Sequence, residues 1–347
     1  MKGEWTAVDL FSGCGGLSAG LESAGFRVLA AVENDPLAAD CYKLNHPQTL
    51  VLNADITKLS ASALMHRLRL RSGELDLLAG CPPCQGFSTL RTLNGGRRIR
   101  EPMNDLVFEF LRFVKVLRPK TLMMENVPGL FRDPRLKRFC RVLSSLGYRW
   151  DCDVLDASEY GVPQRRRRMI LLASRVGPST FASKSRRTRT VREAISHLEA
   201  PGKSGDPLHD HQAHRTPHVQ SLIEKIPADG GGRSSLPQHD QLDCHKKTSG
   251  FKDVYGRMAW DRPAPTITGG CINPSKGRFL HPDQHRAITL REAALLQGFP
   301  GRYKFPLRRG TYPVAQMIGN AFPPQFAMRH ARMLTKQLRL QKKATRN

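Results

Sequence analysis

The residues Asp9-Leu-Phe-Ser-Gly-Cys-Gly-Gly16 connect an apolar run to a helical pattern near the start of the chain. The pattern predicts a strand over Thr6–Phe11, a glycine turn over Ser12–Gly16 and a helix over Leu17–Ala24. Glycines allow a tight turn and let a ligand lie against the backbone, and open α/β sheets bind ligands at this end of their strands. The turn lacks the G-x-G-x-x-G spacing of dinucleotide-binding loops, so by itself it is a weak signal.

Further apolar runs alternate with helical patterns through the first half of the chain. Among these patterns, Leu106–Leu117 has apolar residues at clear helical spacing. Alternation of strands and helices is typical of an open parallel sheet with helices on both faces, so the predicted fold class is α/β. The runs expected to form further buried strands are Val28–Val32, Leu50–Leu52, Leu75–Leu78, Leu122–Met124 and Met169–Ala173.

The composition changes from about Phe181, where Pro, Gly, Ser, His and basic residues become dominant through Gly250. This change predicts a second, smaller and loop-rich domain. We therefore expect a large domain over 1–180, a small domain over 181–311, and a C-terminal segment, 312–347, that returns to the large domain.

Two further helices are indicated toward the end of the chain. Thr289 and Glu292 fit a capping box, in which a hydroxyl and a carboxylate satisfy the free N–H groups of the first helical turn. The helix that they begin is expected to stop at Gly298, and a last helix is expected to begin near Pro324.

The composition points to a nucleic-acid partner and excludes several classes of protein. Lys and Arg total 55 against 30 Asp and Glu, so the 347-residue chain has a formal charge of +25, which favours a polyanion. The eight cysteines are irregularly spaced, which is typical of free thiols in a reducing compartment. No apolar run approaches the ~20 residues of a membrane span, and Met1–Thr6 does not read as a signal peptide. Secreted, membrane and fibrous proteins are therefore excluded.

Two acidic residues follow predicted strands. Glu33 ends the second strand, where a carboxylate that binds ribose hydroxyls is expected, and Asp55 follows the third, where it can accept a hydrogen bond from an adenine amino group. Alternatively, both carboxylates cap the helices that follow them. Together with the glycine turn, they favour a cofactor of the adenosine type.

The segment Gly80-Cys-Pro-Pro-Cys-Gln-Gly-Phe-Ser88 follows the fourth predicted strand. A C-x-x-C pair can bind zinc or do redox chemistry, but zinc needs four ligands and a thioredoxin-like motif opens a helix directly. We interpret Cys81 as a small buried residue and Cys84 as a candidate nucleophile. Glu125 ends the next strand, where a carboxyl group beside a thiolate suits attack on an electron-poor ring or, alternatively, caps a helix.

In this order, these residues resemble the DNA cytosine-5 methyltransferase family of the bacterial restriction-modification type, and the resemblance covers nearly the whole chain. Each motif is moderately specific, whereas six in register are highly specific. The six are Asp9–Gly16, Pro83-Cys84-Gln85, Glu125-Asn126-Val127, Gln164-Arg-Arg-Arg-Arg168, Arg291-Glu292 through Gly298-Phe299-Pro300, and Gln316-Met-Ile-Gly-Asn-Ala-Phe-Pro-Pro324.

The resemblance implies a Rossmann-like sheet that binds S-adenosylmethionine, a target-recognition domain, and a flipped cytosine in a short specific duplex sequence as substrate. Cys84 would attack C6 of the base and Glu125 would bind N3 and the exocyclic amine. Arg168 would hold the O2 edge, and Arg166 would help to position the catalytic loop. The residues expected to bind the cofactor are Phe11, Gly13, Gly15, Glu33, Asp55, Pro83 and Asn320.

The resemblance also implies DNA contacts, with Thr266 expected to brace the target phosphate. No metal is expected, because His209, His211, His214 and His218 fit no common site, and we interpret them as a polar loop near DNA. Within the target-recognition region, roughly Lys203–Lys252 lies outside the segments that resemble the family framework. Because this part is compact, we expect the recognised DNA sequence to be short. The residues expected to contact DNA are Gln85, Ser88, Gln164, Thr266 and Arg257.

Two alternatives to this function stay open at this point. One is a transfer-RNA cytosine-5 methyltransferase, and the other is a non-catalytic homologue that binds nucleic acid. Intact Cys84, Glu125 and Arg168 disfavour the second, and the well-developed middle region favours DNA over RNA. The expected enzyme is a monomer in the bacterial cytoplasm, without membrane contacts, and any cognate restriction endonuclease would act separately.

Overall fold

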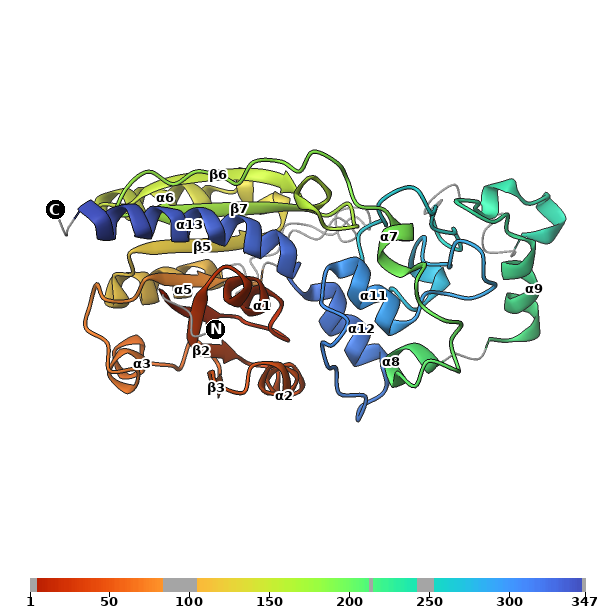
Figure 1. The fold of residues 1–347 in the computed structure, drawn as a ribbon, viewed down its shortest axis with the longest axis horizontal. Coiled ribbons are helices and arrows are strands. Elements are labelled where there is room, and N and C mark those ends of the chain that lie inside the picture. Colours follow the sequence, from red (N-terminus) through yellow and green to blue (C-terminus); the bar gives the residue numbers. More distant parts are fainter. Residues whose placement is uncertain (1–4, 84–104, 212–214, 242–252, 345–347) are drawn as a thin grey trace. The chain divides into compact units, whose positions relative to one another are not determined.

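The computed structural model describes residues 5–83, 105–211, 215–241 and 253–344. The chain forms two compact units, of which the first combines Met1–Tyr160, Arg167–Lys184 and Phe322–Asn347 (Figure 1). The second combines Gly161–Arg166 and Ser185–Ala321. None of the described helices combines the length and the apolar character needed to cross a membrane.

The first unit is built on a seven-stranded sheet with the strand order β3-β2-β1-β4-β5-β7-β6. The five strands predicted first from the sequence pair in parallel, and each is largely buried or partly buried. They are β1 (Trp5–Leu10), β2 (Phe26–Glu33), β3 (Leu50–Asn53), β4 (Leu77–Gly80) and β5 (Thr121–Asn126).

The remaining two strands are antiparallel and extend the predicted parallel sheet into a mixed one. β7 (Arg167–Ser174) runs antiparallel to β5, and β6 (Arg149–Asp156) runs antiparallel to β7. β6 was not predicted from the sequence, because this edge strand alternates Asp and Arg with apolar residues and only Leu155 is buried. A sheet edge next to solvent needs no continuous apolar run.

Helices cover both faces of the sheet, with α5 and α6 on one face and α1 and α13 on the other (Figure 1). On the second face α13 packs along α1, where Gly20 lies against the backbone of Pro324. The helices of the first unit are α1 (Gly16–Ser23), α2 (Pro36–Asn45), α3 (Ala61–Arg67), α5 (Leu106–Leu117), α6 (Pro134–Ser145) and α13 (Pro324–Ala344), with 3₁₀ turns η3 (Pro128–Arg132) and η4 (Ala157–Tyr160).

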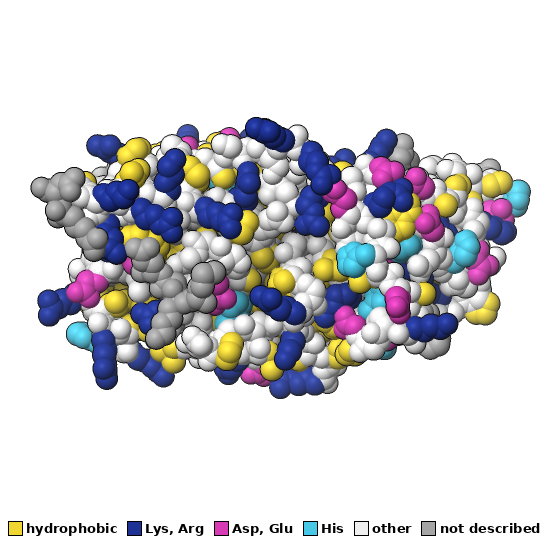
Figure 2. Space-filling view, viewed as in Figure 1, with side chains coloured by type: hydrophobic (Ala, Val, Ile, Leu, Met, Phe, Trp, Pro, Cys, Tyr) yellow, Lys and Arg dark blue, Asp and Glu magenta, His cyan; other side chains and the backbone are white. Residues whose placement is uncertain are grey.

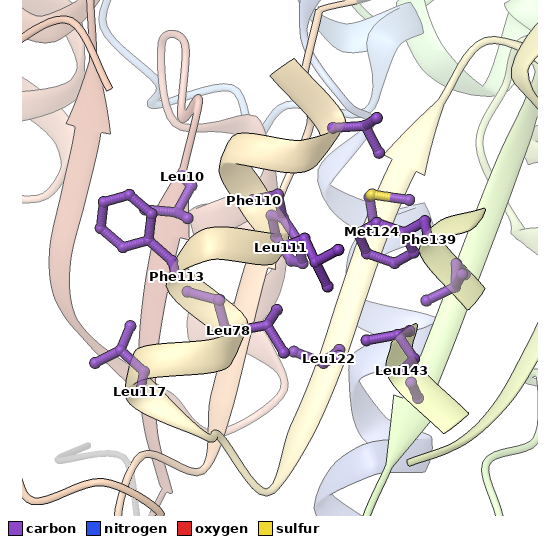
Figure 3. Close-up of a cluster of buried hydrophobic side chains, with 14 of the residues drawn as sticks. Leu10, Leu78, Phe110, Leu111, Phe113, Leu117, Leu122, Met124, Phe139 and Leu143 are labelled. Carbon is purple, nitrogen blue, oxygen red and sulfur yellow. The ribbon is translucent and has the colours of Figure 1, made fainter. Parts of the chain in front are cut away.

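The main apolar core lies between α5, α6 and the central strands (Figure 3). Phe110 and Phe113 of α5 are fully buried there, as is Phe139 of α6. Each such side chain contributes about 1.5–3 kcal/mol through the apolar surface it removes from water. This core fixes the central strands, and therefore fixes the loops that follow their carboxyl ends.

The second unit is rich in loops, and among its described residues β pairing is limited to isolated bridges. The predicted capping box is confirmed, because Glu292 N donates to Thr289 Oγ1 and Thr289 N donates to Glu292 Oε2, at 3.1 and 2.7 Å. The helices are α7 (Val191–Ile195), α8 (Pro207–Asp210), α9 (Pro217–Lys225), α11 (Leu290–Gln297) and α12 (Thr311–Asn320), with 3₁₀ turns η5 (Arg233–Ser235), η6 (Gln238–Asp240) and η7 (Pro274–Lys276).

Candidate active site

The loops after β1, β2, β4 and β5 meet at one edge of the sheet. The register pairs Leu10 with both Val32 and Gly80, and Gly80 with Met124, so these four strands end side by side. A Cβ on Gly80 would lie 2.6 Å from the carbonyl oxygen of Leu10, which only glycine permits. The sequence therefore brings the glycine turn, Glu33, the cysteine loop and Glu125 to the same edge.

The glycine turn depends on residues in the left-handed region of backbone space. Gly13 has φ 55° and Gly15 has φ 97°, and Phe11, which begins the turn, has φ 59°. Ser12 N donates to Val32 O, and Gly15 N donates to Ser12 O, each at 3.0 Å. The turn leads directly into the N-terminus of α1, where the first N–H groups of a helix have no partner within the helix.

Glu33 joins the glycine turn to the start of α2. Its Oε2 accepts a hydrogen bond from Gly13 N at 2.7 Å, and its Oε1 accepts one from Asp35 N at 2.8 Å. Burial raises the pKa of the Glu33 carboxyl above its ordinary value, while these backbone donors oppose the rise. The structure thus brings together two of the residues that the sequence assigns to the cofactor.

A buried hydrogen-bond chain that the sequence analysis missed lies beneath the turn. Tyr42 Oη donates to Ser18 Oγ at 2.6 Å, and Ser18 Oγ donates to Asp9 Oδ2 at 2.7 Å. Burial raises the pKa of Asp9 to about 7. Asp9 Oδ1 and Ser12 Oγ are buried without a hydrogen-bond partner among the described residues. An acid inside an apolar strand, directly before a glycine turn, is the sequence signal for this group.

Asp55 caps the turn after β3 and not the following helix α3, whose N-cap is Ser60. Its Oδ1 accepts hydrogen bonds from Thr57 Oγ1 at 2.8 Å and from Thr57 N at 3.0 Å, and these bonds lower the pKa of the carboxyl. Oδ2 has no partner among the described residues, so capping leaves one oxygen for a ligand.

Glu125 of β5 and Arg168 of β7 form an ion pair, with 2.9 Å between Oε1 and Nε. The two side chains are 12% and 16% exposed, so the pair is shielded from water but remains accessible at the strand-end edge. Arg168 also donates to the carbonyl of Arg167 at 2.7 Å. A carboxyl group and a guanidinium in contact present both an acceptor and donors to a planar polar ring.

The start of the cysteine loop is anchored to the same edge. Asn126 Nδ2 donates to Pro82 O at 2.9 Å, and Cys81 N donates to Leu10 O at 3.3 Å. Although Cys81 is partly exposed, desolvation raises the pKa of its thiol well above the ordinary value, and the carboxyl groups of Glu125 and Asp9 add to the rise. Cys81 is therefore a neutral thiol. Cys84, Gln85 and Ser88 lie outside the described residues, and Pro83 is the last described residue before them.

Gln164 and Arg257, two residues predicted to contact DNA, have side chains that are fully buried in the second unit. Gln164 donates to Gln297 Oε1 at 2.6 Å and accepts from Ile267 N at 2.8 Å. Arg257 donates to the carbonyls of Ile223, Ile226, His281 and Gln284 and to a ring nitrogen of His285. The hydrogen-bonding groups of both side chains are thus used inside the protein.

The other predicted site residues of the second unit, Arg166, Thr266 and Asn320, differ in how far they are exposed to solvent. Arg166 is buried and donates to Ile267 O at 3.0 Å and Gly319 O at 2.9 Å, so it holds the segment around Thr266 against α12. Thr266 is partly exposed and donates to Arg165 O at 2.7 Å. Asn320 is exposed at the end of α12.

The predicted histidine loop is corrected at His209, which is buried and bonded to Thr289 Oγ1 and Glu199 O at 2.9 and 2.8 Å. It therefore supports α11, whereas His211 is exposed and His214 lies outside the described residues. Among the residues that the structure describes, no cluster of three or more His, Cys, Asp or Glu could hold a metal ion.

Comparison with known proteins identifies the family. The model of the C-5 cytosine-specific DNA methylase family matches residues 5–336. The Type II methylase M.HgiDII of Herpetosiphon aurantiacus is 36% identical over 336 residues, which cover 91% of this chain and 91% of that protein. The Type II methyltransferase M1.HphI of Haemophilus parahaemolyticus is 35% identical, with 95% of this chain and 87% of that protein covered.

A solved structure shares the fold across both chains. It is a prophage-encoded protein of E. coli, assigned as a DNA modification methyltransferase, with a TM-score of 0.75 at 24% identity. The alignment covers 97% of this chain and 100% of that one. The family match over nearly the whole length, together with relatives above 30% identity, shows that this chain belongs to the C-5 cytosine-specific DNA methylases.

Proposed function

We propose that this DNA cytosine-5 methyltransferase acts on a cytosine flipped out of a short specific duplex sequence, through a covalent bond between Cys84 and C6 of the base. Family membership establishes the overall reaction and DNA as its substrate. The ion pair between Glu125 and Arg168 carries the finer proposal, because it lies at the strand-end edge where the chain enters the cysteine loop.

The polar groups of a cytosine ring match the chemistry of this pair. Glu125 would bind N3 and the exocyclic amine, and Arg168 would donate to O2. C5 of cytosine is a poor nucleophile while the ring is aromatic, and the edge of the base is inaccessible inside a duplex. The base must therefore leave the stack before the protein can reach C6.

A temporary bond to sulfur solves the problem of the unreactive ring. The Cys84 thiolate adds to C6 while Glu125, as the carboxylic acid, donates its proton to N3, so that no net charge remains at N3 and C5 becomes nucleophilic; the proton returns to Glu125 when the C6–S bond breaks. After C5 accepts the methyl group, a base removes the proton from C5, the C6–S bond breaks and the thiolate is released. A nearby guanidinium such as that of Arg168 favours the ionised thiol.

S-adenosylmethionine is the proposed methyl donor, and it supplies an electrophilic methyl group when bound. The first unit would hold it with Phe11, Gly13, Gly15, Glu33 and Asp55, together with Pro83. Two observations fit a ligand with an amino group and hydroxyls, namely the unpartnered buried atoms Asp9 Oδ1 and Ser12 Oγ and the free oxygen of Asp55. Asn320, of the second unit, is the remaining proposed contact.

The proposed partner is double-stranded DNA, bound by a monomer, with any restriction endonuclease acting as a separate protein. The formal charge of +25 supports binding to the phosphate backbone. Thr266 is proposed to brace the target phosphate. Gln85 and Ser88 are proposed as further contacts.

The test measures transfer of a labelled methyl group from S-adenosylmethionine to plasmid DNA carrying many sequence contexts. We expect Cys84→Ser to lower the rate by at least about 10³-fold, because a hydroxyl is a far weaker nucleophile than a thiolate. The matched control is Cys152→Ser on β6, for which burial raises the pKa of the thiol to about 12, and it should retain the wild-type rate.

DNA that contains 5-fluorocytosine provides the second readout, because fluorine at C5 cannot leave as a proton does. The wild-type enzyme should remain covalently attached to this DNA, and Cys84→Ser should not. Methyl transfer to transfer RNA but not to DNA, or a covalent complex formed equally by Cys84→Ser, would overturn the proposal.

A further inference from the structure

The C-terminal helix α13 carries a row of cations that the reaction does not use. Between Pro324 and Ala344 the sequence contains Arg and Lys residues but no Asp or Glu. Arg332, Lys336, Arg339 and Lys343 are exposed and recur at spacings of four, three and four residues, which places them on one face of the helix. Figure 2 shows dark blue side chains gathered over this helix.

The opposite face of α13 explains why the cations point outward. Ala327, Ala331, Leu334 and Leu338 are buried, and α13 packs along α1 on this side. A Cβ on Gly20 of α1 would meet the Pro324 carbonyl at 2.4 Å, so the two helices are in very close contact. The orientation of the helix is therefore fixed by packing, and the row of cations, which we call the α13 basic face, is rigidly presented.

The α13 basic face has little internal neutralisation. Its four cations (Arg332, Lys336, Arg339 and Lys343) form no ion pair with any residue that the structure describes. Like charges four residues apart on a helix destabilise it by a few tenths of a kcal/mol each. An external anion would relieve this repulsion.

A hollow of about 650 Å³ runs beside these cations. Its lining includes Ala24, Thr335 and five basic side chains of α13, namely Arg332, Lys336, Arg339, Lys342 and Lys343. The ammonium group of Lys342 also lies 5.4 Å from the centre of the Trp5 ring. The face therefore combines a concave surface with concentrated positive charge.

The hollow lies near the amino ends of the strands, whereas the candidate active site lies at their carboxyl ends. α1 begins at the carboxyl end of β1, so Ala24, directly after α1, lies at the amino edge, where Trp5 also begins β1. The eight residues of β2 span about 26 Å between the two edges. An anion on the α13 basic face is therefore distinct from the phosphates around the target cytosine.

We propose that the α13 basic face is a second duplex-binding surface, which holds the phosphate backbone of a DNA segment other than the one that carries the target cytosine. From Arg332 to Lys343 the cations span about 16 Å of helix, and each strand of B-DNA carries one phosphate per about 3.4 Å of its axis. Side chains of arginine and lysine bind phosphates without reading the base sequence. Such a surface keeps the enzyme on DNA between target sites.

The test counts duplexes bound per protein chain, using a 14-base-pair duplex without cytosine methylation and without cofactor. At low salt we expect the wild-type protein to bind two duplexes. In the variant Arg332→Glu/Lys336→Glu/Arg339→Glu, the affinity of the second, weaker site for the duplex should fall at least about tenfold. At the same duplex concentration this variant should therefore bind one duplex. The salt dependence of the second site should correspond to about three phosphate contacts.

The matched control changes the same net charge elsewhere. Lys137, Arg138 and Arg141 are exposed on α6, on the other face of the sheet, and their replacement by Glu should leave two duplexes bound. If the control loses the second duplex as well, overall charge explains the binding and the proposal is wrong. A wild-type protein that binds one duplex also overturns it.

A second variant separates surface chemistry from misfolding. Arg332→Gln/Lys336→Gln/Arg339→Gln keeps good helix formers and removes like-charge repulsion, so it should fold at least as well as the wild type while it loses the second duplex. The initial rate of methyl transfer to a short duplex should be unchanged in this variant. A proportional loss of that rate would place the surface in the primary DNA site, against the proposal, while a failure of Cys84 chemistry would leave the binding count unaffected.

Discussion

Asp9 is a buried carboxyl group whose protonation state changes near neutral pH. Burial raises its pKa to about 7, above the value of about 3.9 in an unfolded chain. The folded protein therefore binds this proton more tightly than the unfolded chain. The stability that the proton contributes is complete below about pH 4 and is lost as the pH rises to 7.

We predict that Asp9→Asn removes this dependence, because an amide cannot ionise but still accepts the hydrogen bond from Ser18. Between pH 4 and pH 8 the free energy of unfolding should fall by on the order of 4 kcal/mol less in the variant than in the wild type. Urea unfolding at both pH values measures the difference. Asp105→Asn, at an exposed position, serves as the control, and identical pH profiles for Asp9→Asn and wild type would contradict the prediction.

Side-chain direction limits what could be predicted at single residues. The resemblance places Gln164 and Arg257 in motifs of a DNA-binding family, but their partners are main-chain groups such as Ile267 N and Ile223 O, which lie far away in the sequence. No periodic pattern encodes such contacts. Glu33 was predictable because strand ends meet at one edge, and its bond to Gly13 follows from that geometry.

At the scale of elements, Gly20 lies at a tight contact between α1 and α13. A Cβ at this position would lie 2.4 Å from Pro324 O and 2.5 Å from Ala327 Cβ, and main chain cannot easily move away. We predict that Gly20→Ala lowers the free energy of unfolding by about 1–3 kcal/mol through overpacking, although alanine is the better helix former.

Urea unfolding measures this change, and Ser23→Ala on the exposed side of the same helix provides the comparison. Ser23→Ala should be within about 0.5 kcal/mol of the wild type. A stabilised Gly20→Ala variant would show that helix propensity outweighs packing at this contact.

The elements that could be predicted are those with a local signal. α5 has the predicted bounds Leu106–Leu117 because its buried residues recur at helical spacing, and α11 follows the capping box at Thr289. β6 and the antiparallel direction of β7 could not be predicted. Strand direction depends on which distant strand supplies the hydrogen bonds, and the partner of β7, β5, lies more than forty residues earlier in the chain.

At the scale of the whole molecule, the positive charge determines how DNA affinity responds to salt. With a formal charge of +25, we predict that affinity for a long duplex falls by about 10³-fold or more between 50 and 200 mM salt. Fluorescence anisotropy with a labelled duplex measures this dependence. A nearly flat response would mean that contacts to bases, and not phosphates, dominate binding.

Between β6 and β7 the chain passes from the first unit into the second and back again. The antiparallel pair is interrupted by Gly161–Arg166, which belongs to the second unit, and Arg168 of the ion pair follows two residues later. Within Gly161–Arg166, the side chains of Gln164 and Arg166 donate hydrogen bonds to buried groups of the second unit. Any shift of that unit when DNA is engaged would consequently pull on the Arg168 guanidinium through two peptide units. Substrate recognition and the electrostatics of the reacting base would then be mechanically coupled.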